Sequence, residues 1–237
     1  MSDSSTRRNH IPAGAGEAGD VPVVPAATVM LLRGSPLEVL LVRRHQKSSF
    51  VPDTWVFPGG SVDEDDALSA SRLGASSTLR IMQVAAIREL FEETGIWMGG
   101  PLADPVETRA LLRSGALNFP QLDLSSIDFD ALVWTSRWIT PVTIPKRFDT
   151  WFFLAAAPPS ASAIADASEI TEVLWITPEE ALRREELQMV FPQIRNLEAI
   201  SGFASIDELL AARRGADIQP VLPRVVVEDG RKKIVLP

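Results

Sequence analysis

Residues Arg88–Ile96 read RELFEETGI and place three glutamates directly before a glycine. The apolar residues that precede and interleave with them predict a helix over residues 78–94, which the glycine would end as a left-handed C-cap. On such a helix Glu89, Glu92 and Glu93 are spaced i, i+3 and i+4, so they share one side. Like charges at this spacing, near the end where the helix dipole disfavours anions, destabilise the helix unless water or cations compensate them.

Two interpretations of this acidic helix follow. In the first, it is a solvated surface, which is the commoner role of a bare acidic pair. In the second, the glutamates bind a divalent cation such as Mg²⁺, which prefers carboxylate oxygens and often shares its shell with substrate phosphates. Arg88 could orient one glutamate through a bidentate ion pair. The surrounding sequence has to decide between them.

Composition narrows the classes of partner. The chain has 237 residues and a formal net charge of −8, from 23 basic and 31 acidic residues. Nucleic-acid polymers and anionic membranes would repel such a protein at long range, so we expect neither as a partner. With no cysteine and two histidines, disulfides, thiolate catalysis and Cys- or His-rich metal sites are excluded. A small phosphorylated substrate remains compatible with this charge.

The chain is predicted to form one domain over residues 21–237, after a flexible tail at 1–20 that is rich in Ser, Gly, Ala and charge. The N-terminal stretch lacks the apolar segment of a signal peptide. The longest apolar runs are too short to span a bilayer. We therefore expect a cytoplasmic protein.

Apolar runs on both sides of the acidic helix predict strands. Residues 26–34 and 37–45 should form an antiparallel pair, and residues 54–60 a third strand ended by Pro58 and two glycines. Further strands are expected at 137–141, 149–157 and 172–177.

Helices and strands interleave irregularly along the rest of the chain. Helices are expected at 105–115, 178–187, 192–201 and 205–214, and a terminal hairpin around Asp229 and Gly230. This order favours an α/β (α+β) fold with a mixed central sheet and helices on both faces.

The stretch from FPGGSVDEDD to AAIRELFEETGI, residues 57–96, resembles the Nudix box. The matching positions are Pro58, Gly59, Gly60, Arg88, Glu89, Leu90, Glu92, Glu93, Gly95 and Ile96. Asp66 stands where the pattern has a glutamate, six residues after Gly60. Arg88 lies at twice the usual interval from Gly60, which indicates an insertion of about one helix at residues 66–80. Such an interrupted box resembles the Nudt19-like subgroup, whose animal members are described as coenzyme A diphosphatases, and the resemblance covers most of residues 25–230.

The resemblance implies a Nudix-type α/β/α sandwich that binds Mg²⁺ or Mn²⁺. The metal ligands would be Glu89, Glu92 and Glu93, joined by the backbone carbonyl of Gly59, with Arg88 beside them in the catalytic group. The implied reaction is hydrolysis of the diphosphate bond of a nucleoside diphosphate linked to another moiety. Coenzyme A or acyl-CoA is the preferred substrate, giving 3′,5′-ADP and (acyl-)4′-phosphopantetheine. NADH, ADP-ribose, a dinucleoside polyphosphate, or a non-catalytic nucleotide sensor are the alternatives.

The remaining roles are less constrained. The general base is either a box glutamate or Glu169, with Glu172 as its substitute. Two further groups of residues have two interpretations each. The basic residues are phosphate contacts or surface charges, and the tryptophans are stacking or core residues. The basic residues are Arg43, Arg44, Lys47 and Arg147, and the tryptophans are Trp97, Trp138 and Trp151. His45 is expected to be neither ligand nor catalyst. A homodimer stays open.

Overall fold

A computed structural model describes residues 21–159, 161–228 and 231–236. Within them one mixed sheet contains the strands β1 (Val23–Arg33), β2 (Glu38–Arg44), β3 (Trp55–Val56), β4 (Gly59–Ser61), β5 (Val133–Ile139), β6 (Arg147–Ala156), β7 (Ile170–Ile176) and β8 (Pro220–Val221). The strand order is β3-β2-β1-β6-β5-β8, with β4 paired to β1 and β7 paired to β2. β1 runs parallel to β6, and β5 to β8, while the other pairs are antiparallel.

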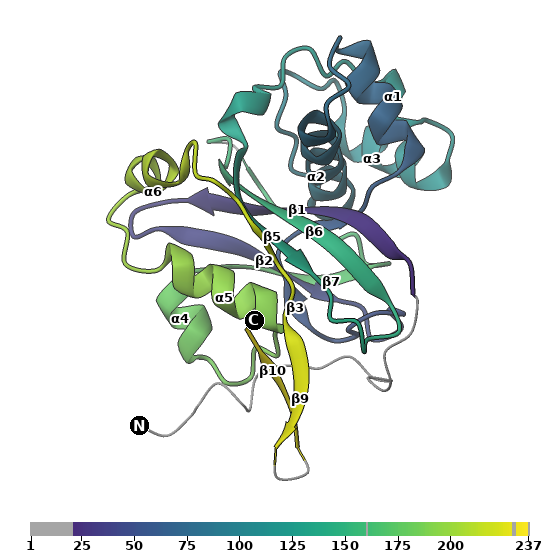
Figure 1. Cartoon of the computed structure of the whole chain (residues 1–237). Helices are drawn as coiled ribbons and strands as arrows, with labels where there is room; N and C mark the ends of the chain where they lie inside the picture. Colours follow the sequence, from purple (N-terminus) through teal and green to yellow (C-terminus); the bar gives the residue numbers. More distant parts are fainter. Residues whose placement is uncertain (1–20, 160, 229–230, 237) are drawn as a thin grey trace.

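Helices cover both faces of this sheet (Figure 1). They are α1 (Glu64–Arg72), α2 (Thr78–Thr94), α3 (Pro105–Ser114), α4 (Pro178–Arg183), α5 (Phe191–Ile200) and α6 (Ile206–Arg213), with short 3₁₀ turns η2 (Phe119–Gln121) and η3 (Phe129–Ala131). α1, α2 and α3 lie on one side, and α4, α5 and α6 on the other. The predicted α/β/α sandwich with a mixed sheet is confirmed.

The burial of both faces of β1 explains why its apolar residues do not alternate with polar ones. Val29 and Leu31 pack into the core beneath α2, whereas Met30 and Leu32 pack into the core beneath α4, α5 and α6. Both faces of the strand are therefore buried, as is typical of a central strand covered by helices on each side. The predicted antiparallel partner, β2, pairs with it through Leu32 and Val39.

The acidic helix α2 spans the predicted 78–94. The Ser77 side chain caps its start by accepting a hydrogen bond from the Arg80 amide, 3.2 Å away. Gly95 ends it with a φ of 75°, the left-handed conformation that glycine adopts at low cost. The box insertion forms α1, which begins at Glu64, slightly before the predicted boundary.

Two predicted elements are interrupted. The strand expected at 54–60 is divided into β3, which pairs with β2, and β4, which pairs with β1. Pro58 lies between them, and because proline has no N–H it cannot continue the hydrogen-bond ladder. The helix expected at 178–187 ends at Arg183, since the next residues turn inward to bury Leu187 and Met189. The Gln188 carbonyl then accepts a hydrogen bond from the Trp55 amide at 2.8 Å. Tertiary contacts override the local helix preference here.

The C-terminal segment forms the predicted hairpin. β9 (Arg224–Glu228) and β10 (Arg231–Val235) pair antiparallel. The expected Asp229-Gly230 turn, like the tail at 1–20, lies outside the described residues. None of the described helices is long and apolar enough to cross a membrane.

Candidate active site

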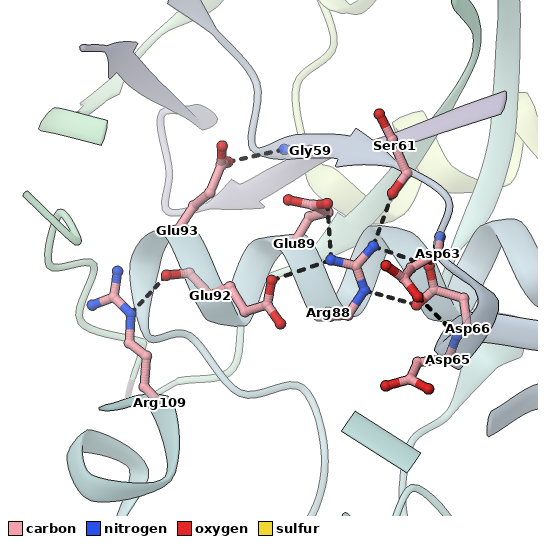
Figure 2. A network of polar contacts seen from close by, with 10 residues as sticks. All are labelled: Gly59, Ser61, Asp63, Asp65, Asp66, Arg88, Glu89, Glu92, Glu93 and Arg109. Carbon is pink, nitrogen blue, oxygen red and sulfur yellow. Dashed lines mark hydrogen bonds and ion pairs between the residues drawn. The ribbon is translucent and has the colours of Figure 1, made fainter. Parts of the chain in front are cut away.

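A buried arginine organises the acidic end of α2 (Figure 2). Arg88 Nε and Nη2 donate to the two carboxylate oxygens of Asp66, at 2.8 and 3.0 Å. Its Nη1 donates to Glu89 at 2.9 Å and to Glu92 at 3.1 Å, and Nη2 also reaches the Ser61 carbonyl at 2.9 Å. Burial alone would lower the pKa of this guanidinium, but the hydrogen bonds to Asp66 and the nearby carboxylates raise it, so Arg88 stays charged.

Asp66 reaches Arg88 from the first turn of α1. Its side chain is fully buried and also accepts a hydrogen bond from the Asp63 amide at 2.8 Å, which completes a capping box. Asp66 precedes most of the inserted chain, so its interval from Gly60 is unchanged. The insertion thus leaves a carboxylate in contact with the arginine of the box.

Glu89 and Glu93, one helical turn apart, both lie against the glycine turn. The Gly59 amide donates to Glu93 Oε2 at 3.0 Å (Figure 2). A Cβ on Gly60 would sit 2.5 Å from Glu89 Oε1, and one on Gly59 would sit 2.4 Å from the Ala27 carbonyl oxygen. Neither glycine can be replaced without moving its neighbours.

This corner of the molecule holds buried negative charge that is only partly balanced. Burial raises the pKa of Glu89 to about 7, against the lowering effect of Arg88. Burial and the charge of Glu89 raise the pKa of Glu93 well above its ordinary value. Glu92 is raised in pKa as well by burial, and Glu169 adds negative charge to all three. A hard divalent cation would relieve this repulsion, so the donor set suits Mg²⁺ or Mn²⁺ in kind.

The three glutamates of α2 do not converge as helical spacing predicted. In the described part of the chain, no three acidic or imidazole groups stand together at the spacing of a ready-made metal site. The Arg88 guanidinium draws the Glu92 carboxylate along the helix surface, while Glu93 turns to the Gly59 amide. The attraction of the arginine, which spacing alone does not include, accounts for the difference.

A cleft of about 370 Å³ opens beside the glycine turn. Its charged lining residues are Arg44, Asp63, Arg88, Glu89, Lys146 and Glu169. Arg44 and Lys146 supply positive charge in the same cleft as the Glu89 carboxylate. Such a cleft can pair with phosphate oxygens and also hold the cation that accompanies them.

The loop that carries Glu169 is fixed on both sides. The Asp166 carboxylate accepts a hydrogen bond from the Glu169 amide at 3.1 Å, and the Glu169 carbonyl accepts one from the His45 amide at 2.7 Å. From α3, Arg113 donates to the Asp166 carbonyl at 2.8 Å and to the Ser168 hydroxyl at 2.9 Å. Glu169 is therefore an exposed side chain on a well-anchored backbone at the cleft.

Comparison with known proteins finds relatives of this chain. The chain is 30% identical over 219 residues to nudix hydrolase 7 of Caenorhabditis elegans, which covers 88% of this chain and 70% of that protein. The chain belongs to the Nudix hydrolase family. No family model matches it.

Other members of the Nudix family support this assignment. Acyl-coenzyme A diphosphatase NUDT19 of Gallus gallus is 28% identical over 264 residues, covering 78% of this chain and 69% of that protein. The Xenopus laevis protein of the same name is 26% identical, and the chain spans 62% of its length. The crystal structure of a Nudix hydrolase from Alicyclobacillus acidocaldarius matches with a TM-score of 0.72 at 29% identity, covering 84% of this chain and 100% of that one.

Three of the four predicted phosphate contacts of this Nudix hydrolase, Arg43, Lys47 and Arg147, lie outside the described lining of the cleft. Arg43 forms ion pairs with Asp53 at 2.8 Å and with Glu172 at 2.5 Å. Arg147 donates to the Thr140 carbonyl at 3.1 Å. The guanidinium groups of Arg43 and Arg147 are thus occupied elsewhere, and Arg44 is the predicted phosphate contact in the described lining of the cleft.

Sequence reasoning missed Lys146, which lines the cleft next to the predicted Arg147. Lys146 directly precedes β6, and because alternate residues of a strand face the same side, extending this period back by one residue places Lys146 on the side of Phe148 and Thr150. Both of these also line the cleft. The two-residue period of the strand would have favoured Lys146 over its neighbour. Lys47 is exposed and is absent from this lining.

The three tryptophans considered for base stacking are packed against protein. Trp151 stacks on Trp134 with ring centroids 4.0 Å apart, and Trp138 contacts Phe191 edge-on. Trp97 contacts Phe91 and Phe119 and donates to the Gly100 carbonyl. His45 is tied to the main chain, since its Nδ1 accepts the Lys47 amide.

Proposed function

We propose that this Nudix hydrolase cleaves the diphosphate bridge of a nucleoside diphosphate linked to another group. Coenzyme A or an acyl-CoA is the preferred substrate, and the products are 3′,5′-ADP and (acyl-)4′-phosphopantetheine. The observation that carries the proposal is the incompletely balanced carboxylate pair of Glu89 and Glu93, buried beside the glycine turn at the cleft that also contains Arg44 and Lys146. The substrate choice is supported by relatives that are named acyl-CoA diphosphatases.

Glu89 and Glu93 are the proposed metal ligands, with the Gly59 carbonyl and Glu92 completing the set. Mg²⁺ or Mn²⁺ held there would neutralise charge on the diphosphate oxygens. Arg88 acts as a positioning residue, because its guanidinium holds Glu89 and Glu92 while its other edge is locked onto Asp66. Outer partners of this kind orient metal-ligating groups.

Glu169 is the proposed general base. It lines the cleft, and it remains accessible to water while its loop is anchored. Glu172, the substitute considered from sequence, is engaged by Arg43. Glu169 would take a proton from the water that attacks phosphorus, as one P–O bond forms and the bridging P–O bond breaks.

Paired glutamine variants test this role. Glu169→Gln should lower kcat by roughly 10²–10⁴-fold, the usual contribution of a general base. Glu172→Gln, a matched change three residues along the chain, should leave kcat near that of the unaltered protein. Equal activity of the two variants would contradict the assignment.

Product analysis by mass spectrometry tests the reaction itself. The protein with Mg²⁺ would be offered coenzyme A, acetyl-CoA, NADH, ADP-ribose and a dinucleoside polyphosphate, with Glu93→Gln as the inactive control. Release of 3′,5′-ADP from the CoA compounds, lost in the variant, is the expected result. Cleavage of a different compound would keep the chemistry and change the substrate. No cleavage with Mg²⁺ or Mn²⁺ would refute the hydrolase and favour a nucleotide sensor.

A further inference from the structure

A second cavity, of about 110 Å³, adjoins the proposed diphosphate cleft. Five residues line both spaces: Phe50, Phe148, Thr150, Val190 and Gln193. Because the two spaces share these side chains, the side cavity lies within reach of a molecule whose diphosphate lies in the cleft. We refer to it as the side cavity.

Among the described residues, those that line the side cavity are mostly apolar, and none of them is charged. Its walls come from β5 and β6, from the start of α5, and from the C-terminal hairpin, where Pro223 directly precedes β9 and Ile234 lies in β10. Aromatic rings of Trp138, Phe152 and Phe191 form much of the surface. An anionic group would enter it unpaired, at a high cost in free energy, so its occupant should be uncharged.

Two of the residues that line this cavity each bury one polar atom. Trp138 Nε1 and Gln193 Oε1 have no hydrogen-bond partner among the described residues. Both residues are only 8% exposed. One atom is a donor and the other an acceptor, and leaving either unsatisfied in a buried position is unfavourable. A ligand that offers one acceptor and one donor would satisfy both.

We infer that the side cavity binds the uncharged, amide-containing arm of the substrate, an inference that rests on the proposed function. The carbonyl oxygen of an amide would accept from Trp138 Nε1, and its N–H would donate to Gln193 Oε1. The methyl and methylene groups of a pantetheine arm would pack on the aromatic walls. The 3′,5′-ADP half carries phosphates that the cavity cannot pair, so it belongs on the side of Arg44 and Lys146.

Isothermal titration calorimetry without divalent metal tests the inference separately from turnover. The two proposed product halves, 4′-phosphopantetheine and 3′,5′-ADP, would be titrated into the unaltered protein and three variants. Trp138→Phe removes the donor and keeps an aromatic ring, and Gln193→Met removes the acceptor at similar volume. Trp175→Phe is the matched control, because Trp175, which lies in β7, packs against the guanidinium of Arg33 and lines neither space.

The Kd of 4′-phosphopantetheine should rise by about tenfold in each of the first two variants, as expected for one lost hydrogen bond. The Kd of 3′,5′-ADP should be unchanged throughout, and Trp175→Phe should match the unaltered protein. A selective loss of 3′,5′-ADP binding would place the nucleotide in the cavity and overturn the inference. So would unchanged affinities in variants whose thermal unfolding shows them to be folded, or no detectable binding of 4′-phosphopantetheine to the unaltered protein.

The two proposals fail in different ways. If 4′-phosphopantetheine binds as expected but no CoA compound is cleaved, the proposed hydrolysis is wrong and the side cavity stands. If CoA is cleaved with the same KM by Trp138→Phe and by the unaltered protein, the side cavity is wrong and the hydrolysis stands.

Discussion

Replacing Asp66 by asparagine removes the charge that faces Arg88 while keeping the side-chain shape. Both carboxylate oxygens of Asp66 accept from Arg88, and one also accepts from the Asp63 amide. In Asp66→Asn one of these oxygens becomes an NH₂ group, which meets hydrogen-bond donors instead of matching them. The variant therefore leaves the buried guanidinium only partly paired.

Breaking a buried ion pair by removing one partner costs about 3–5 kcal/mol of unfolding free energy. Arg88 keeps Glu89, Glu92 and the Ser61 carbonyl, which places Asp66→Asn near the lower end, at about 3 kcal/mol. In a chain of this length each kcal/mol shifts Tm by about 2–4 °C, so we expect a loss of about 6–12 °C.

Thermal unfolding, followed by circular dichroism, measures the loss, and the Mg²⁺ dependence of hydrolysis measures the effect on the site. Because Arg88 would orient Glu89 and Glu92 less firmly, the apparent Mg²⁺ affinity should fall by about 10–100-fold. Asp65→Asn is the control, since Asp65 is a half-buried acid in the same helical turn, and none of the hydrogen bonds that Arg88 makes to described residues goes to it. If the two variants share the same Tm and metal dependence, Asp66 does not organise this site.

Three further perturbations probe neighbouring parts. In protein stripped of metal, Glu89 has a pKa of about 7 instead of 4.5, so the folded state binds more protons than the unfolded chain between these values. The free energy of unfolding should fall by about 3 kcal/mol as pH rises through that window, at about 1.4 kcal/mol per unit, and urea titrations that show a rise would refute this. Gly60→Ala should keep the fold but raise the Mg²⁺ requirement by roughly tenfold or more, because its Cβ displaces the Glu89 carboxylate; a metal titration of activity checks it. Arg113→Ala frees one anchor of the Glu169 loop and should lower kcat by roughly tenfold with little change in KM, measured by steady-state kinetics.

Elements whose limits are encoded locally could be predicted from the sequence. α2 spans the predicted residues because its two ends are set by neighbours in the chain, the Ser77 hydroxyl and the Gly95 backbone. The β1–β2 hairpin likewise follows from a short turn between two apolar runs. The terminal hairpin strands, β9 and β10, follow the same logic.

Features that depend on distant contacts could not be predicted. The division of the third strand follows from a change of pairing partner at Pro58. The separation of Glu92 from Glu93 follows from Arg88, whose position is in turn set by Asp66 on another helix. Arg43 was predicted to contact phosphate, but its guanidinium pairs with Glu172, which is 129 residues away in sequence. Helical and strand periods specify a direction for each side chain but not the charge it meets there.

The capping box of α1 has a consequence for how such chains can change length. Asp66 is held from both sides, by the Asp63 amide and by the guanidinium of α2, and the residues between the two helices contribute neither. Additions or deletions between Leu73 and Ser77 would alter the count of residues without altering where Asp66 meets its partner. A sequence motif that requires fixed intervals between its residues would then fail to match such a chain, although the contact between Asp66 and Arg88 is retained. The connection between α1 and α2 is, for the same reason, a permissive place to graft a reporter peptide.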